Sequence, residues 1–249
     1  MTNHITGLVV LDMAGTTVRD NDEVLLCFSR ACREAGLTAS DKRLNALMGV
    51  SKLEVFHLLW REELGQNAEA GDVASRAGDT YRSFCGILEG YYLSHPVEPT
   101  EGALDVFRQL RDQGVRIALN TGFYRKVTDI ILDKLGWLAG LDAQYIGGPD
   151  SIIDFSITSD EVPRGRPEPF MIRKAMSVFG IDDPARVVKI GDTPVDLEEG
   201  RRAGVAFNLA VTNGTHTRAE LELPDSDGLL NTLSELPDWL RVRGWPTSG

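Results

Sequence analysis

Short apolar runs and longer segments of helical periodicity divide the chain. Residues 8–11 (LVVL) are too few for a helix and suit a buried parallel strand, which ends in the polar turn DMAGTTV. From residue 23 to about 93, apolar residues recur at helical spacing, as in VLLCFSRACREAGL, which stops at Gly36. We therefore expect helices, and no strand, between residues 23 and 93.

The pattern changes after a proline- and glycine-rich linker at residues 95–102. Helices are expected in ALDVFRQLRDQG, YRKVTDIILDKLG, PEPFMIRKAMSVFG and DLEEGRRAG, and strands in VRIALN, ARVVKIG and VAFNLAV. Strands that alternate with helices predict an α/β fold, a doubly wound (Rossmann-like) parallel sheet whose ligand lies beyond the carboxyl ends of the strands. We predict a core of residues 1–19 and 98–249, and a helical cap of residues 20–97 inserted after the first strand, over the ligand site.

Composition narrows the possible partners. With 26 Lys and Arg against 37 Asp and Glu, the 249-residue chain has a formal charge of −11. An acidic chain argues against nucleic acid and against an anionic membrane surface, but it leaves room for a small anionic substrate. No apolar run approaches the ~18 residues of a membrane span.

Targeting and cysteine usage predict a cytoplasmic protein. MTNHITG lacks a basic region, so we expect no signal peptide. The three cysteines include no CxxC pair, which argues against a disulfide framework or a zinc site and fits a reducing compartment.

Four polar clusters follow predicted strands. They are Asp12 with Ala14, Gly15, Thr16 and Thr17; Thr121 with Gly122; Arg166 in GRPEPF; and Asp192 with Thr193 and Asp196. Each cluster alone is typical of a turn, a helix cap or, for Arg166, a surface cation. If the strands are neighbours, however, the clusters converge at one edge of the sheet.

The chemistry of these clusters is complementary. Asp12 and Asp192 offer the hard oxygen ligands that Mg²⁺ prefers, while Thr121 and Arg166 can hold an anion. A carboxylate can also accept a phosphoryl group, giving an acyl phosphate that water hydrolyses. The sequence thus predicts a magnesium-dependent hydrolase that acts through a phospho-aspartate at Asp12.

These motifs resemble those of the haloacid-dehalogenase-like hydrolase superfamily, in the same order and over nearly the whole core. The resemblance implies that Asp12 is the nucleophile, and that its side chain and the Ala14 carbonyl hold Mg²⁺ with Asp192, supported by Asp196. It also implies that phosphoryl oxygens are bound by Thr16, Thr121, Gly122 and Arg166.

Ala14 marks a departure from most phosphatases of this superfamily, which have an acid there to protonate the leaving alcohol. The phosphonoacetaldehyde hydrolase branch also has alanine there, favours arginine in GRPxP, and carries MGxxK in its cap. Here that last motif is Met48-Gly49-Val50-Ser51-Lys52. The resemblance implies that Gly49 contacts the substrate and that Lys52 forms a Schiff base with a substrate aldehyde. We expect Met48 and Lys52 to lie within about 40° of each other on one helix face.

Two positions depart from that branch, which favours histidine where this chain has Val55 and tyrosine where it has Phe123. The first interpretation is a phosphonatase-like hydrolase that cleaves a small phosphonate such as phosphonoacetaldehyde. The alternative is a phosphomonoesterase or mutase-like enzyme on a small phosphate ester, with Lys52 as an anion contact. A non-catalytic phosphate-binding protein is the third. The chain could be a monomer or a homodimer.

Overall fold

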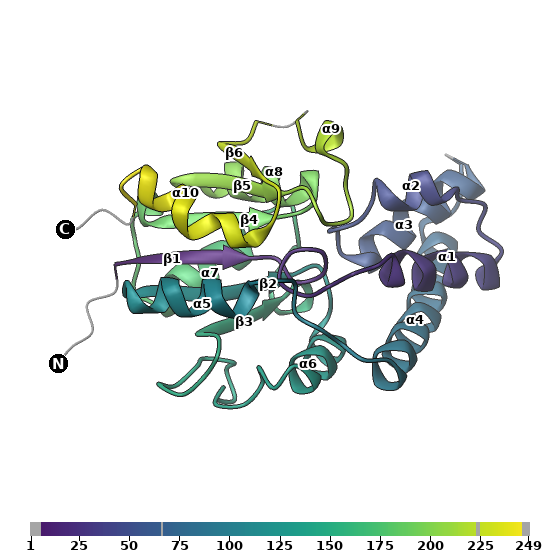
Figure 1. Cartoon of the computed structure of the whole chain (residues 1–249). Coiled ribbons are helices and arrows are strands. Elements are labelled where there is room, and N and C mark those ends of the chain that lie inside the picture. The colour runs from purple at the N-terminus through teal and green to yellow at the C-terminus, as the bar shows by residue number, and fades with distance from the viewer. Residues whose placement is uncertain (1–5, 66, 223–224, 246–249) are drawn as a thin grey trace.

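The computed structural model describes residues 6–65, 67–222 and 225–245. Those residues form a six-stranded parallel sheet in the order β3-β2-β1-β4-β5-β6 (Figure 1). Its strands are β1 (Gly7–Leu11), β2 (Val115–Thr121), β3 (Phe155–Thr158), β4 (Val187–Gly191), β5 (Phe207–Val211) and β6 (Gly228–Leu230). The predicted α/β class, a doubly wound parallel sheet, is confirmed.

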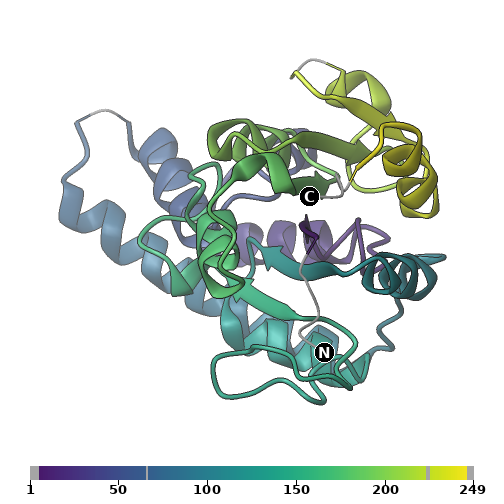
Figure 2. The same ribbon diagram turned by 90° about the vertical axis from the view of Figure 1, so that its left-hand side faces the viewer.

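Helices cover both faces of the sheet because alternate strand residues point to opposite sides. One face packs on α5 (Ala103–Asp112), α6 (Arg125–Lys134) and α10 (Leu236–Val242), and the other on α7 (Phe170–Val178) and α8 (Pro194–Ala203). Figure 2 shows α5 and α10 on one side of the strands and α7 on the other. With both faces covered, every residue of β1 is buried, as its apolar run predicted.

Two strands, β3 and β6, were not predicted from the sequence pattern. The four residues of β3 follow a long irregular segment after α6, and β6 has only three residues at the sheet edge. A strand this short has too few residues to show a period of two. The short helix α9 (Arg218–Leu221) and α10 were also not predicted.

Among the described residues between β1 and α5, the regular elements are all helices, as expected. They are α1 (Glu23–Ala35), α2 (Asp41–Asn45), α3 (Lys52–Leu64) and α4 (Ala70–Ser94). Phe28, Phe56 and Phe84 meet edge to face at the centre of this segment, with ring centroids 5.3–6.1 Å apart, an arrangement that aromatic quadrupoles favour. These helices lie beyond the carboxyl ends of the strands (Figure 1).

The expectation that Met48 and Lys52 share a helix face is wrong. Helix α2 ends at Asn45 and α3 begins at Lys52. Between them Gly49 has φ +80°, a left-handed conformation that ends the helical run. Met48 is buried in this turn.

The two connections between the helical segment and the sheet lie side by side. The amide of Arg19 donates a hydrogen bond to the carbonyl of Glu98 at 2.9 Å, and the two side chains form an ion pair at 2.8 Å. The two chain crossings between the helical segment and the sheet therefore share one narrow junction.

Among the described helices, none combines the length and apolar character needed to cross a membrane. Residues 1–5, on which the signal-peptide expectation partly depends, lie outside the described residues.

Candidate active site

Asp12 stands at the carboxyl end of the central strand β1, where a tight turn fixes its backbone. The Asp12 amide donates to the Ile190 carbonyl at 3.0 Å, and the Thr17 hydroxyl donates to the Asp12 carbonyl at 2.8 Å. Gly15 has φ +83°, and a Cβ there would collide with the Asp192 carboxylate. The DMAGTTV turn therefore needs glycine at this position to bring the two acids together.

The predicted clusters converge because their strands are neighbours. Thr121 is the last residue of β2 and Asp192 follows β4, the strands on either side of β1. Arg166 arrives differently from the prediction, which placed each cluster directly after a strand. Strand β3 ends at Thr158, a 3₁₀ turn follows, and Arg166 extends from the loop before α7.

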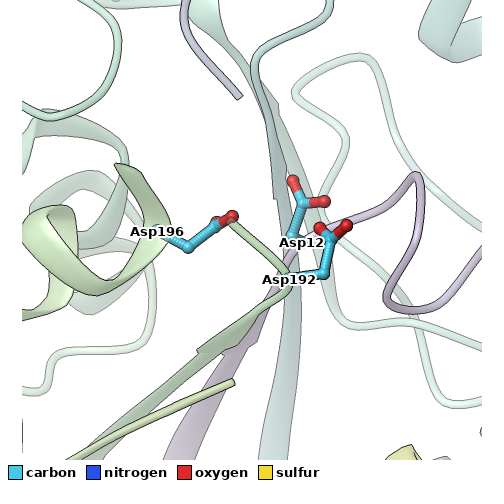
Figure 3. Close-up of side chains that lie close together, drawn as sticks. All are labelled: Asp12, Asp192 and Asp196. Atoms are coloured by element: carbon cyan, nitrogen blue, oxygen red, sulfur yellow. The ribbon is translucent and has the colours of Figure 1, made fainter. Parts of the chain in front are cut away.

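Three buried carboxylates meet at this edge of the sheet (Figure 3). One oxygen each from Asp12, Asp192 and Asp196 lies within 4.8 Å of the others. Burial and the neighbouring acids raise the pKa of Asp192 to about 7. Burial also raises the pKa of Asp12 to about 6, although Arg166 opposes the shift. Crowded acids of this kind indicate a site for a cation.

Arg166 is buried among these acids and connects them. Its guanidinium lies 2.7 Å from Asp12 Oδ1, 3.0 Å from Asp196 Oδ1 and 3.1 Å from Glu199 Oε2. Burial alone would raise the pKa of Asp196, but Arg166 and Lys189 lower it to about 2. Asp196 thus stays ionised while it holds Arg166 in place.

Three members of this network were missed by the sequence prediction. Lys189 Nζ donates to Asn120 Oδ1 at 2.8 Å and pairs with Asp196 at 2.7 Å. The side-chain amide of Asn120 donates through Nδ2 to both carboxylate oxygens of Glu199, at 3.0 and 2.8 Å. One signal was available: Lys189 interrupts the apolar run of a buried strand, where a charge needs partners.

The helical segment closes over the acids and leaves a small cavity. The cavity measures about 40 Å³, space for roughly three water molecules. Its lining includes Asp12, Ala14, Gly49, Lys52, Thr121, Gly122, Arg166 and Asp192. A Cβ at position 122 would lie 2.5 Å from the Gly49 carbonyl oxygen, so the two loops touch backbone to backbone.

Thr16 and Asp196 lie outside this lining. The Thr16 hydroxyl is 3.4 Å from Asp192 Oδ1, and both oxygens of Asp196 face the buried network. Three lining residues were not singled out from the sequence, namely Asp20, Val24 and Thr215. Thr215 donates from its amide and its hydroxyl to Asp192 Oδ2, at 2.7 Å each.

Lys52 is a buried amine with few polar partners. Its side chain is 6% exposed, and its Nζ lies 5.0 Å from the centroid of the Phe28 ring. The carbonyls of Leu47 and Val50 are 3.4 and 3.5 Å away. Burial lowers the pKa of Lys52 to about 8 against the opposing charge of Asp20. About a tenth of the amine is therefore neutral at pH 7.

Known proteins resemble this chain both in sequence and in structure. A phosphonoacetaldehyde hydrolase of Bacillus cereus (strain B4264) is 29% identical over 232 residues, which cover 88% of this chain and 81% of that protein. A solved phosphonoacetaldehyde hydrolase-like protein from Oleispira antarctica has a TM-score of 0.74 at 18% identity, covering 99% of this chain and 96% of its own. A putative β-phosphoglucomutase from Bacteroides vulgatus also scores 0.74 at 18% identity, with 97% and 90% covered.

These two structures share the fold of this chain. The model of the haloacid dehalogenase-like hydrolases matches residues 6–204. That match spans the sheet from β1 to β4, the helices beyond it and the four motifs around Asp12. The chain belongs to the haloacid dehalogenase-like hydrolase family.

Proposed function

We propose that this hydrolase cleaves the carbon–phosphorus bond of a small phosphonate that carries an aldehyde, with phosphonoacetaldehyde as the reference substrate. The observation that carries the proposal is Lys52, a buried amine of lowered pKa that lines the same cavity as Asp12. Similarity to phosphonoacetaldehyde hydrolases of Bacillus supports it. In this proposal residues 20–97 are the cap, which brings Lys52 to the core.

The phosphoryl half of the reaction belongs to the core residues. Asp12 would attack phosphorus and form an acyl phosphate that water then hydrolyses. Arg166 and the Thr121 hydroxyl would hold phosphoryl oxygens, as would the backbone of Gly122. Arg166 already lies 2.7 Å from Asp12 Oδ1, so it is placed to receive a phosphoryl group there.

The residues present fit a magnesium ion. Asp12, Asp192 and the Ala14 carbonyl would supply oxygen ligands only, the type that Mg²⁺ takes. Asp196 would support them through Arg166 and Lys189. Burial and neighbouring acids raise the pKa values of Asp12 and Asp192, so a cation bound between them would stabilise both carboxylates. A bound Mg²⁺ would neutralise charge on the phosphoryl oxygens and offset the repulsion between these acids.

Lys52 would carry out the other half of the reaction, at the substrate aldehyde. A neutral amine condenses with an aldehyde to an iminium, which accepts the electron pair of the breaking carbon–phosphorus bond and becomes an enamine. The carbon–phosphorus bond can therefore break without forming a bare carbanion. This leaving group does not need the acid that Ala14 replaces.

A second function remains a candidate because of two apolar side chains. Val55 is buried and Phe123 lines the cavity, and neither can transfer a proton. In a phosphate-ester hydrolase or mutase-like enzyme, Lys52 would contact the substrate anion instead. Ala14 argues against this reading, since an alcohol leaving group needs a positioned acid, worth ~10²–10⁴-fold. The non-catalytic alternative is set aside, because the chain belongs to a family of hydrolases.

Reduction with borohydride in the presence of phosphonoacetaldehyde and Mg²⁺ tests the proposal. We expect a stable adduct on Lys52, located by peptide mass mapping, and none in Lys52→Arg, since a guanidinium does not condense usefully with an aldehyde. Lys42→Arg, at an exposed position of α2, is the matched control and should keep the adduct. A folded wild-type protein that gives no adduct would favour the phosphate-ester function.

A further inference from the structure

Asp20 is an acid in the cavity that the proposed reaction has not yet used. It follows the nucleophile turn and lines the cavity together with Lys52. Its Oδ1 is 3.5 Å from the amide of Val24, a long contact. Its Oδ2 is buried, and no donor among the described residues reaches it. The group beside it is the Glu23 carboxylate, which is also an acceptor when ionised.

Among the ionisable side chains that line the cavity with Lys52, only Asp20 has no part in the phosphoryl end of the site. The ionisable side chains of the lining are Asp12, Asp20, Lys52, Arg166 and Asp192. Three of these belong to the phosphoryl end, where Arg166 pairs with Asp12 and Thr215 holds Asp192. The remaining side chains that line the cavity with Lys52 include Val24, Met48, Val50 and Phe123, all apolar.

We propose that Asp20 is the catalytic acid of imine formation at Lys52, giving the proton with which the carbinolamine oxygen leaves as water. This inference rests on the proposed function, because it needs an aldehyde substrate that condenses with Lys52.

The proton balance of the step is simple. Neutral Lys52 attacks the carbonyl carbon, one proton moves from nitrogen to oxygen, and a neutral carbinolamine forms. The Asp20 carboxylic acid then protonates the hydroxyl group. The carbon–oxygen bond breaks, water leaves, and the nitrogen lone pair forms the carbon–nitrogen double bond. The products are an iminium on Lys52 and an Asp20 carboxylate, which are opposite charges in one buried cavity.

The protonation states of Asp20 and Lys52 suit the beginning of imine formation. Burial raises the pKa of Asp20 to about 8, and Glu23 and Asp192 add to the shift. Burial lowers the pKa of Lys52 to about 8, and the charge of Arg166 reinforces the shift. At neutral pH Asp20 therefore holds a proton to give, while part of Lys52 is a free amine.

The test measures how fast Lys52 is trapped. Wild type and variants are mixed with phosphonoacetaldehyde and excess cyanoborohydride, and the Lys52 adduct is followed by mass spectrometry. Asp20→Asn should slow trapping by about 10²-fold or more, the usual loss of a positioned acid. Asp22→Asn makes the same substitution at an exposed acid two residues away and should trap at the wild-type rate.

Two further variants separate chemistry from folding. Asp20→Glu keeps an acid and should retain part of the rate. Asp20→Ala should be slow and should recover when formic acid buffer supplies the missing proton, with circular dichroism confirming that it is folded. If folded Asp20→Asn or Asp20→Ala traps as fast as wild type, Asp20 is not the acid and the proposed function stands. If wild type itself forms no adduct on Lys52, both fail.

Discussion

Arg166 Nη2 lies 2.7 Å from Asp12 Oδ1, and both side chains are buried. The guanidinium does not depend on Asp12 alone, because it also contacts Asp196 and Glu199. A buried cation that lost all its partners would cost several kcal/mol. Here the loss of one acid leaves two others in place, so the nucleophile can be changed without leaving the arginine unpaired.

Asp12→Asn should therefore remove turnover while the protein still folds. An amide is a poor phosphoryl acceptor, so we expect kcat to fall by roughly 10³-fold or more, on the scale of lost nucleophilic catalysis. The measurement is phosphate release, with the unfolding midpoint in urea as the control. Activity within tenfold of wild type would exclude a phospho-aspartate at this position.

Lys52→Met should stabilise the protein at neutral pH. The folded-state pKa of Lys52 is about 8 against an ordinary 10.5, so burial of the charged amine costs about 3 kcal/mol below pH 8. This cost fades as pH rises through 8 and is absent above 10.5. Methionine carries no charge at any pH.

The difference in unfolding free energy between Lys52→Met and wild type should thus be large at pH 7 and small at pH 10.5. Urea unfolding at the two pH values measures it. Lys42→Met, at an exposed site, should show no such change with pH. A difference that is the same at both pH values would contradict a lowered pKa for Lys52.

Magnesium should raise the melting temperature. At a concentration 100 times its Kd, a ligand adds about 2.7 kcal/mol to folding, or roughly 5–10 °C for a chain of this size. Calorimetry with Mg²⁺ and with EDTA measures the shift. Asp192→Asn removes one proposed ligand and should abolish most of it. An equal shift in that variant would place the ion elsewhere.

Gly122→Ala should weaken the contact between the helical segment and the sheet. The added Cβ would lie 2.5 Å from the Gly49 carbonyl oxygen, a backbone atom that cannot rotate away. Overpacking of this kind costs ~1–3 kcal/mol, so we expect kcat/KM to fall about tenfold or more. Gly86→Ala is the control, since its Cβ would meet nothing within 4 Å in α4. That change should leave kcat/KM unaltered; equal losses in both variants would argue against a specific clash.

The sequence predicted most of the sheet because β1, β2, β4 and β5 are apolar runs bounded by turns. Strands β3 and β6 are too short to show a period, and they take their structure from pairing with β2 and β5. Residues close together in sequence, such as Asp12 and Ala14, were assigned together from a motif. Glu199 looks ordinary in its own segment, and only the folded structure brings it to Arg166 and Lys189. The expectation that Met48 and Lys52 share a helix face was wrong because Gly49 turns the chain between them.

The single junction at Arg19 and Glu98 has a consequence for how this molecule could change over evolution. Since the chain leaves the sheet and returns to it at neighbouring points, the whole segment between them could be lengthened, shortened or exchanged without altering the strand order. The phosphoryl chemistry would stay with the sheet while Lys52 and Asp20 were replaced. In such a molecule, the residues that select the substrate could be exchanged without disturbing those that bind the phosphoryl group.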